Sequence, residues 1–205
     1  QDPDSGMVSY FQGARPGYMK LYHTPESSFW CCTGTGMENH VKYRDSIYFH
    51  AGKSLYVNLF IPSTVRWKQQ KAVLTQTTTF PESSGTTLQL QLEQPSEFTL
   101  KLRHPRWSKA AVLLVNGKEA ARSSNPCSYV DVSRTWRSGD EIELQLIMDI
   151  ATDSPPAAPD IVAFTYGPLV LAAALGRDGL AAGSDIIVNE REIGKYNNSP
   201  FTPPV

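Results

Sequence analysis

Two adjacent cysteines, Cys31 and Cys32, are the residues of this sequence best suited to chemistry. A disulfide between neighbours would be strained, because Cα atoms across a trans peptide lie about 3.8 Å apart, below the roughly 4.4–6.8 Å of ordinary disulfides. The pair could instead be two ordinary buried thiols, or two thiolates on one soft metal ion, for which zinc is the best match. The residues alone leave buried thiols and metal ligands equally open.

Two cysteines cannot complete the four-coordinate sphere that zinc prefers. The other candidate donors are a third cysteine and the four histidines: Cys127, His23, His40, His50 and His104. None of these residues stands at a standard metal-ligand spacing. Cys127 comes directly before a strand-like segment that begins at Ser128, so we interpret it as a small core residue and not as a ligand.

Composition excludes some classes of partner. The 205 residues include 19 basic and 20 acidic side chains, and the formal net charge is −1. There is no basic field to attract a phosphate backbone, so we expect no nucleic-acid binding. No apolar run approaches the roughly 20 residues that cross a bilayer, so we expect no membrane partner. The chain begins at Gln1 in a loop-like stretch, and we interpret it as a piece of something longer.

The pair is predicted to lie between a long loop and a short helix. Residues 1–30 carry prolines and glycines that interrupt any regular pattern, with aromatic residues interleaved. Long loops of this kind are often functional. Residues 37–44 are predicted to form a helix, with Thr35 as its N-cap and Glu38 in the position of a capping box.

From Ser46 onward the sequence predicts strands. Hydrophobic and polar residues alternate at 55–60, 88–92, 98–103 and 141–146, which indicates one buried and one solvated face. Asn116-Gly117 is a strong hairpin signal. Two more strands are predicted at 161–166 and 169–173 after a proline-rich connector, and residues 176–205 are predicted to be irregular. Strands at short intervals with no long helix between them favour a mostly β chain built as an antiparallel β-sandwich.

Three segments carry a resemblance to a known family. The most specific is Ser28-Phe29-Trp30-Cys31-Cys32-Thr33-Gly34-Thr35-Gly36-Met37-Glu38-Asn39-His40. The other two are Leu102-Arg103-His104-Pro105-Arg106-Trp107-Ser108, followed by Val115-Asn116-Gly117, and Tyr166-Gly167-Pro168-Leu169-Val170-Leu171. In order and spacing these segments resemble the C-terminal half of glycoside hydrolase family 127 and of close relatives such as family 146, the β-L-arabinofuranosidases. The resemblance covers nearly the whole chain.

The resemblance implies a domain organisation. In that family an (α/α)6 barrel holds the catalytic site, and β-sandwich domains follow it. Carried over, residues 1–45 are the C-terminal remnant of the helical catalytic barrel, and residues 46–205 are a β-sandwich domain. The N-terminal part of the barrel would lie upstream of this chain. The resemblance leaves open whether a bacterial enzyme of this kind is cytoplasmic, periplasmic or secreted.

The resemblance also implies a role for the cysteine pair. The family binds zinc through three cysteines and a glutamate; two of the cysteines are adjacent, and the first of the two is the nucleophile. Carried over, Cys31 is the catalytic nucleophile and a zinc ligand, and Cys32 is a zinc ligand. The remaining ligands and the acid/base glutamate lie upstream, and the substrate is an oligosaccharide or glycan containing arabinofuranose. Several members have Pro and Asn soon after the pair where this chain has Thr33-Gly34-Thr35-Gly36, which puts the sugar specificity in doubt.

Other residues have weaker functional interpretations. Contact with a sugar is one reading for several residues near the pair, with helix stabilisation, packing or loop anchoring as the alternative: Tyr22, His23, Trp30, Glu38, Asn39 and His40. Three tryptophans are predicted to fill the sandwich core: Trp67, Trp107 and Trp136. A basic cluster is predicted on a solvated strand face: Arg103, His104 and Arg106. Rival interpretations of the chain are a non-catalytic carbohydrate-binding or structural sandwich, and a redox or zinc-storage protein.

Overall fold

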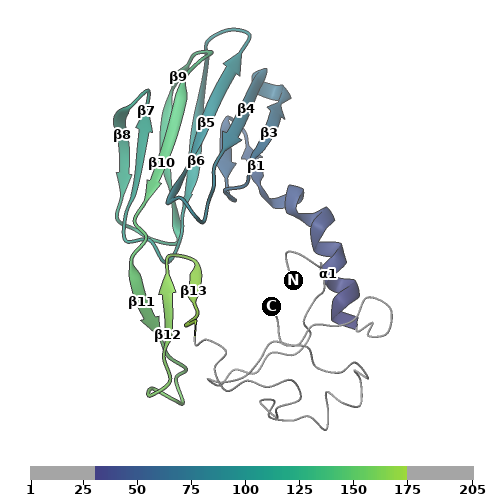
Figure 1. The fold of residues 1–205 in the computed structure, drawn as a ribbon. Helices are drawn as coiled ribbons and strands as arrows, with labels where there is room; N and C mark the ends of the chain where they lie inside the picture. Colours follow the sequence, from purple (N-terminus) through teal and green to yellow (C-terminus); the bar gives the residue numbers. More distant parts are fainter. Residues whose placement is uncertain (1–30, 175–205) are drawn as a thin grey trace. The chain divides into compact units, whose positions relative to one another are not determined.

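A computed structural model describes residues 31–174 of the chain (Figure 1). The chain divides into two compact units, of which one contains the first helix and the other runs from Arg44 to Ala173. The described part is mostly β, as the alternating sequence pattern predicted. Among the described residues, no helix is long and apolar enough to cross a membrane.

The first unit contains the helix α1 (Cys31–Lys42), which is followed by the 3-10 turn η1 (Tyr43–Ser46). The predicted start of this helix, at residue 37, was wrong by six residues. The two glycines at positions 34 and 36 were expected to keep the preceding segment irregular, but a glycine inside a helix costs only about 1 kcal/mol and this helix tolerates both. Thr35 therefore lies within the helix and is not its N-cap.

The second unit contains a four-stranded sheet, which we call sheet A. Its members in spatial order are β1 (Tyr48–Ala51), β2 (Ser54–Val57), β6 (Ser96–His104) and β9 (Ser128–Trp136). β1 pairs with β2 and β6 with β9 in antiparallel fashion, but β2 and β6 are parallel. This one parallel pair is an exception within the antiparallel sandwich that the sequence predicted. Between β2 and β6 the chain crosses to the other sheet and returns, which allows the two strands to run in the same direction.

The other main sheet, sheet B, has six strands and is antiparallel throughout. In spatial order they are β3 (Ser63–Trp67), β4 (Ala72–Thr77), β5 (Gly85–Leu92), β10 (Glu141–Leu146), β7 (Ala111–Val115) and β8 (Lys118–Ser123). The short 3-10 turn η2 (Lys68–Gln70) connects β3 to β4. The hairpin between β7 and β8 turns at Asn116 and Gly117, whose φ angles of 50° and 75° are those of a type I′ turn. The sequence signal at this hairpin is confirmed.

The core lies between the inner faces of sheets A and B. It is formed by alternate residues of the strands in both sheets together with Phe60, all of them buried: Leu55, Val57, Phe60, Trp67, Ala72, Leu74, Leu88, Leu90, Phe98, Leu100, Leu102, Ala111, Leu113, Val115, Val130, Trp136, Ile142, Leu144 and Leu146. The residues between them, such as Gln89 and Gln91, face outward. The β-sandwich predicted from the period of two is therefore confirmed.

One carboxylate joins two turns of this unit. Asp140, just before β10, accepts hydrogen bonds from Asn116 Nδ2 and from the Arg137 backbone N–H, each at 2.8 Å. Burial raises the pKa of Asp140, but these hydrogen bonds and the nearby charges of Arg134 and Arg137 outweigh burial and hold the pKa below its ordinary value. The ionised side chain thus ties the β7–β8 hairpin to the turn that precedes β10.

A small third sheet follows the sandwich in the chain. It consists of β11 (Ile150–Asp153), β12 (Ala163–Tyr166) and β13 (Leu169–Leu171), paired antiparallel. The two predicted strands in this region are present, and each is two residues shorter than expected. Gly167 turns the chain between them with a φ of 55°, and a Cβ at this position would lie 2.7 Å from the Met148 side chain. Predictions for residues 1–30 and 176–205 lie outside the described residues.

Candidate active site

The cysteine pair occupies the N-terminal end of α1, where Cys31 and Cys32 are the first two helical residues. Backbone N–H groups in the first turn of a helix have no partner within the helix, and the aligned peptide dipoles place a partial positive charge there. The first turn of α1 contains no acidic side chain. The helix thus provides an environment that favours an anion at these two positions. The prediction that their sulfur atoms share one metal ion concerns side chains outside the described part of the structure.

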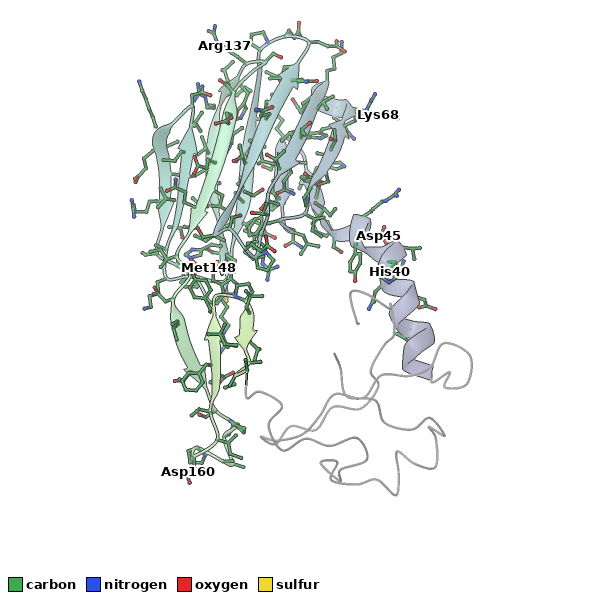
Figure 2. All side chains as sticks on the ribbon, in the orientation of Figure 1. His40, Asp45, Lys68, Arg137, Met148 and Asp160 are labelled. Carbon is green, nitrogen blue, oxygen red and sulfur yellow. The ribbon has the colours of Figure 1, made fainter. Side chains whose placement is uncertain are left out.

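The polar residues after the pair lie on α1, within the part of the helix that the sequence predicted. Glu38, Asn39 and His40 are all exposed. Glu38 is in the second half of the helix, so the alternative reading that it stabilises the helix N-terminus was wrong. His40, labelled in Figure 2, has its ring edge-on to Tyr43 with centroids 5.8 Å apart. Contacts of these residues with a sugar stay a prediction.

The remaining described histidines do not join a metal cluster. His104 is completely buried, although the sequence placed it on a solvated face; its neighbours Arg103 and Arg106 are exposed as predicted. Its Nδ1 pairs with the Ser123 hydroxyl at 3.0 Å, and its Nε2 with the Ser108 carbonyl at 2.8 Å. Because a carbonyl only accepts, Nε2 carries the proton and donates it to Ser108, while Nδ1 accepts from Ser123. Both nitrogens are occupied, so His104 is a structural residue.

Cys127 and His50, the two other candidate ligands among the described residues, are both exposed. Cys127 is an exposed free thiol with a φ of 60°, so its prediction as a core residue was wrong. His50 is exposed, and its ring lies 6.4 Å from that of Trp67. Among the side chains that the structure describes, which do not include those of Cys31 and Cys32, no three histidine, cysteine or acidic groups gather closely enough to hold a metal ion. This leaves the proposed zinc site untested, because its other ligands were expected upstream.

The tryptophans of the sandwich are where the sequence placed them. Trp67 and Trp136 are 3 % and 0 % exposed, and Trp107 is half-buried against the core, stacked on Phe80 at 6.1 Å. Trp30 and His23 lie outside the described residues.

Gln76 is a buried residue that the sequence analysis missed. Its amide bonds to two backbone carbonyls and to the hydroxyls of Tyr48 and Thr86, which makes it part of the core. It lies in the alternating pattern of β4, and this was the signal for its burial.

Two family descriptions match parts of the sequence. The catalytic domain of GH127, the β-L-arabinofuranosidases, matches residues 1–45, and the middle domain of GH127 matches residues 54–148. The first match contains the cysteine pair, and the second lies within the sandwich from the start of β2 to the residue labelled Met148 in Figure 2. No curated protein matches the chain.

Solved structures resemble the described fold. A GH127 β-L-arabinofuranosidase from Geobacillus stearothermophilus T6 is 24 % identical with a TM-score of 0.59, and the match covers 68 % of this chain and 23 % of that one. A glycoside hydrolase is 26 % identical with a TM-score of 0.62, over 78 % and 28 %. A further GH127 β-arabinofuranosidase is 24 % identical with a TM-score of 0.51, over 60 % and 23 %.

The extent of these matches shows how much of its relatives this chain covers. It spans about a quarter of the length of the structures that it resembles. The two family matches follow each other in the order of a catalytic domain and a middle domain, and together they account for more than half of the sequence. The chain therefore belongs to glycoside hydrolase family 127, of which it carries the matched parts of the catalytic and middle domains.

Proposed function

We propose that this chain is part of a retaining glycoside hydrolase that cleaves arabinofuranose-containing glycans with Cys31 as its nucleophile. The observation that carries the proposal is the position of the cysteine pair. It lies inside the segment matched by the GH127 catalytic domain and at the N-terminal end of α1. Family membership supports a glycosidase, and the adjacent thiols supply a nucleophile for it.

The helix N-terminus favours the reactive form of the nucleophile. A thiolate is a much stronger nucleophile than a thiol, and the partial positive charge at a helix N-terminus stabilises the thiolate. An acidic residue in the first turn would oppose this effect, and α1 has none there. The local sequence thus suits an ionised cysteine.

The proposed reaction has two displacements. The Cys31 sulfur attacks the anomeric carbon and forms a carbon–sulfur bond, while the bond from that carbon to the leaving oxygen breaks and an upstream carboxylic acid protonates the oxygen. Water then attacks the same carbon, gives a proton to the carboxylate and releases the Cys31 thiolate. Two inversions at one carbon give overall retention of configuration. The sulfur replaces the carboxylate nucleophile that retaining glycosidases ordinarily use.

Zinc is the cofactor that the donor set fits. Cys31 and Cys32 offer two soft sulfur ligands at neighbouring positions, which suits zinc better than magnesium or calcium. They would hold the ion together with a cysteine and a glutamate from upstream of this chain. A bound zinc ion keeps a coordinating thiol deprotonated at neutral pH and fixes the direction of its sulfur.

The zinc proposal predicts a change in metal content. We expect the purified full-length protein to contain about one zinc ion per chain, and Cys32→Ser to lose most of it, because one sulfur ligand is removed. Plasma emission spectrometry measures the metal directly, without reference to activity. Cys127→Ser is the matched control and should keep the wild-type zinc content, because Cys127 lies exposed on the sandwich. Equal zinc in wild type and Cys32→Ser would contradict the assignment of Cys32.

The glycosidase proposal is tested with a panel of nitrophenyl glycosides. We expect the full-length protein to release nitrophenol from a β-L-arabinofuranoside faster than from pyranosides of similar leaving group. The 205-residue chain alone should release none, because we expect the acid/base residue to lie upstream of it. Full-length protein that binds zinc yet cleaves no member of the panel would favour the non-catalytic alternatives, a carbohydrate-binding or structural role.

A further inference from the structure

One side of the small third sheet is apolar and exposed. The register places alternate residues of its three strands directly opposite one another on this side. One of the six is Thr152, and the other five are large apolar or aromatic residues that are 38 % to 71 % exposed. We call these five the apolar face: Ile150 of β11, Phe164 and Tyr166 of β12, and Leu169 and Leu171 of β13.

The alternation in these strands is that of a sheet with one covered side. The opposite side carries smaller or polar residues at most positions: Ala151, Asp153, Ala163, Thr165 and Val170. A sheet of three strands gains its stability by packing its hydrophobic side, and an exposed apolar patch of this kind marks an interaction site. In the part of the chain that the structure describes, no residue after Leu146 belongs to the core of the sandwich. The apolar face therefore needs a cover that the described residues do not supply.

Contacts at the start of β11 hold the third sheet against one end of the sandwich. The backbone N–H of Ile147 donates a hydrogen bond to the Ser108 hydroxyl at 2.9 Å. Lys109 forms a 2.8 Å ion pair with Asp149, and the N–H of Gly167 donates to the Asp149 carbonyl at 3.3 Å. The sheet is thus held in place on the sandwich, and a surface that is already positioned loses little conformational entropy when it binds.

The chain enters the sandwich from the catalytic domain just before β1. The segment matched by the catalytic domain ends at residue 45. The two residues that follow it are anchored to the loop after β2, because Asn58 donates hydrogen bonds from Nδ2 to the Ser46 carbonyl at 3.1 Å and from its backbone N–H to the Ile47 carbonyl at 2.8 Å. Ile47 is buried, which fixes this entry point on the sandwich.

Aromatic contacts connect the entry point to the base of the third sheet. Phe60, in the loop that anchors the entry point, meets Phe80 edge to face with ring centroids 5.4 Å apart. Phe80 stacks on Trp107, the residue before Ser108, whose hydroxyl holds the start of the third sheet. Figure 2 agrees: the labelled Asp45 and Met148 lie toward one end of the sandwich, and Arg137 lies at the other. The catalytic domain and the third sheet therefore join the sandwich at the same end.

We propose that the apolar face is a contact surface for the catalytic barrel upstream of this chain. A domain joined at residue 45 is held near the face at a high effective concentration, which a separate molecule does not share. The chemistry also fits, since permanent interfaces are more hydrophobic than transient ones. A sugar chain would need several polar partners, and of the five side chains Tyr166 alone carries a polar atom. The proposal does not depend on the role of Cys31.

Cysteine labelling of the full-length protein tests this contact. Leu171→Cys places a thiol on the apolar face, and Val170→Cys, the matched control, places one on the opposite side of the same strand. Both variants also carry Cys127→Ser, which removes an exposed native thiol. We expect a water-soluble maleimide to label Leu171→Cys about tenfold more slowly than Val170→Cys in the full-length protein, and both at similar rates in the 205-residue chain. Mass spectrometry of the labelled peptides measures the rates.

Two labelling results would overturn the proposal. Equal rates for the two thiols in the full-length protein would mean that nothing covers the apolar face. Slow labelling of Leu171→Cys in the 205-residue chain as well would mean that the cover lies within this chain or, if the protection is lost on dilution, in a second copy. Circular dichroism of each variant verifies folding.

Photo-crosslinking identifies the cover independently of the labelling. Phe164→p-benzoylphenylalanine keeps an aromatic ring on the apolar face and should form a crosslink, on irradiation of the full-length protein, to a peptide upstream of residue 1. A crosslink to a second copy, to residues 1–205 or to a peptide downstream of them would overturn the proposal. Nitrophenol release by the full-length protein is measured separately, so the contact can fail while the glycosidase proposal stands.

Discussion

Cys31→Ser in the full-length protein is expected to lower kcat for a nitrophenyl β-L-arabinofuranoside by about a thousandfold or more. A serine hydroxyl ionises far less readily than a thiol, and at neutral pH it offers almost no anion to attack the anomeric carbon. The effect should fall on kcat rather than on KM, because the substrate keeps its other contacts. Initial-rate measurements over a range of substrate concentrations separate the two constants.

The matched control is Cys127→Ser, which makes the same chemical change at an exposed position in the turn before β9. It should keep wild-type kcat. A second measurement separates a nucleophile from a residue that only holds the metal: a slow substrate should leave one sugar residue on the peptide that contains Cys31, detected by mass spectrometry. Near-normal turnover by Cys31→Ser, or a sugar adduct on another residue, would refute the assignment of Cys31.

The sandwich was predictable because its long strands alternate between buried hydrophobic residues and solvent-exposed polar ones. In β6, Phe98, Leu100 and Leu102 are buried, and the alternate residues between them are not. The same pattern extends to His104, whose burial the alternation indicated although its chemistry suggested a solvated side chain. Cys127 is the opposite case, because it was predicted to be buried and is exposed. The strand pattern was extended one residue too far, to a position where the backbone takes a φ of 60° and leaves the strand direction.

Other features depend on contacts that a local pattern does not contain. The parallel pairing of Ser54 with Thr99 joins strands 45 positions apart, on either side of an excursion through sheet B. Cys31 and Cys32 are the reverse case. Their adjacency is visible at once, but the resemblance places the groups that would complete their site upstream of this chain, so neither the sequence nor the sandwich defines that site.

Trp136→Ala is expected to lower the free energy of unfolding of the 205-residue chain by about 3–5 kcal/mol. Trp136 is fully buried, stacks on Phe98 with ring centroids 5.8 Å apart, and donates a 2.9 Å hydrogen bond from Nε1 to the Phe98 carbonyl. The substitution leaves a cavity between the sheets and removes that bond. Because domains are stable by only about 5–15 kcal/mol, the loss is a large fraction of the total. Urea unfolding followed by circular dichroism measures it, and a loss below about 1 kcal/mol would contradict the expected cavity.

Phenylalanine at two tryptophan positions separates the hydrogen bond from the packing. Trp67 also packs against Phe98, with centroids 5.2 Å apart, and it is almost as deeply buried as Trp136. However, the Trp67 Nε1 has no hydrogen-bond partner within the described residues. Trp136→Phe loses a satisfied buried hydrogen bond, whereas Trp67→Phe removes an unsatisfied buried donor, so the first should be more destabilising by about 1–2 kcal/mol. Equal losses in the two variants would mean that the Trp67 N–H has a partner, such as a bound water molecule, in solution.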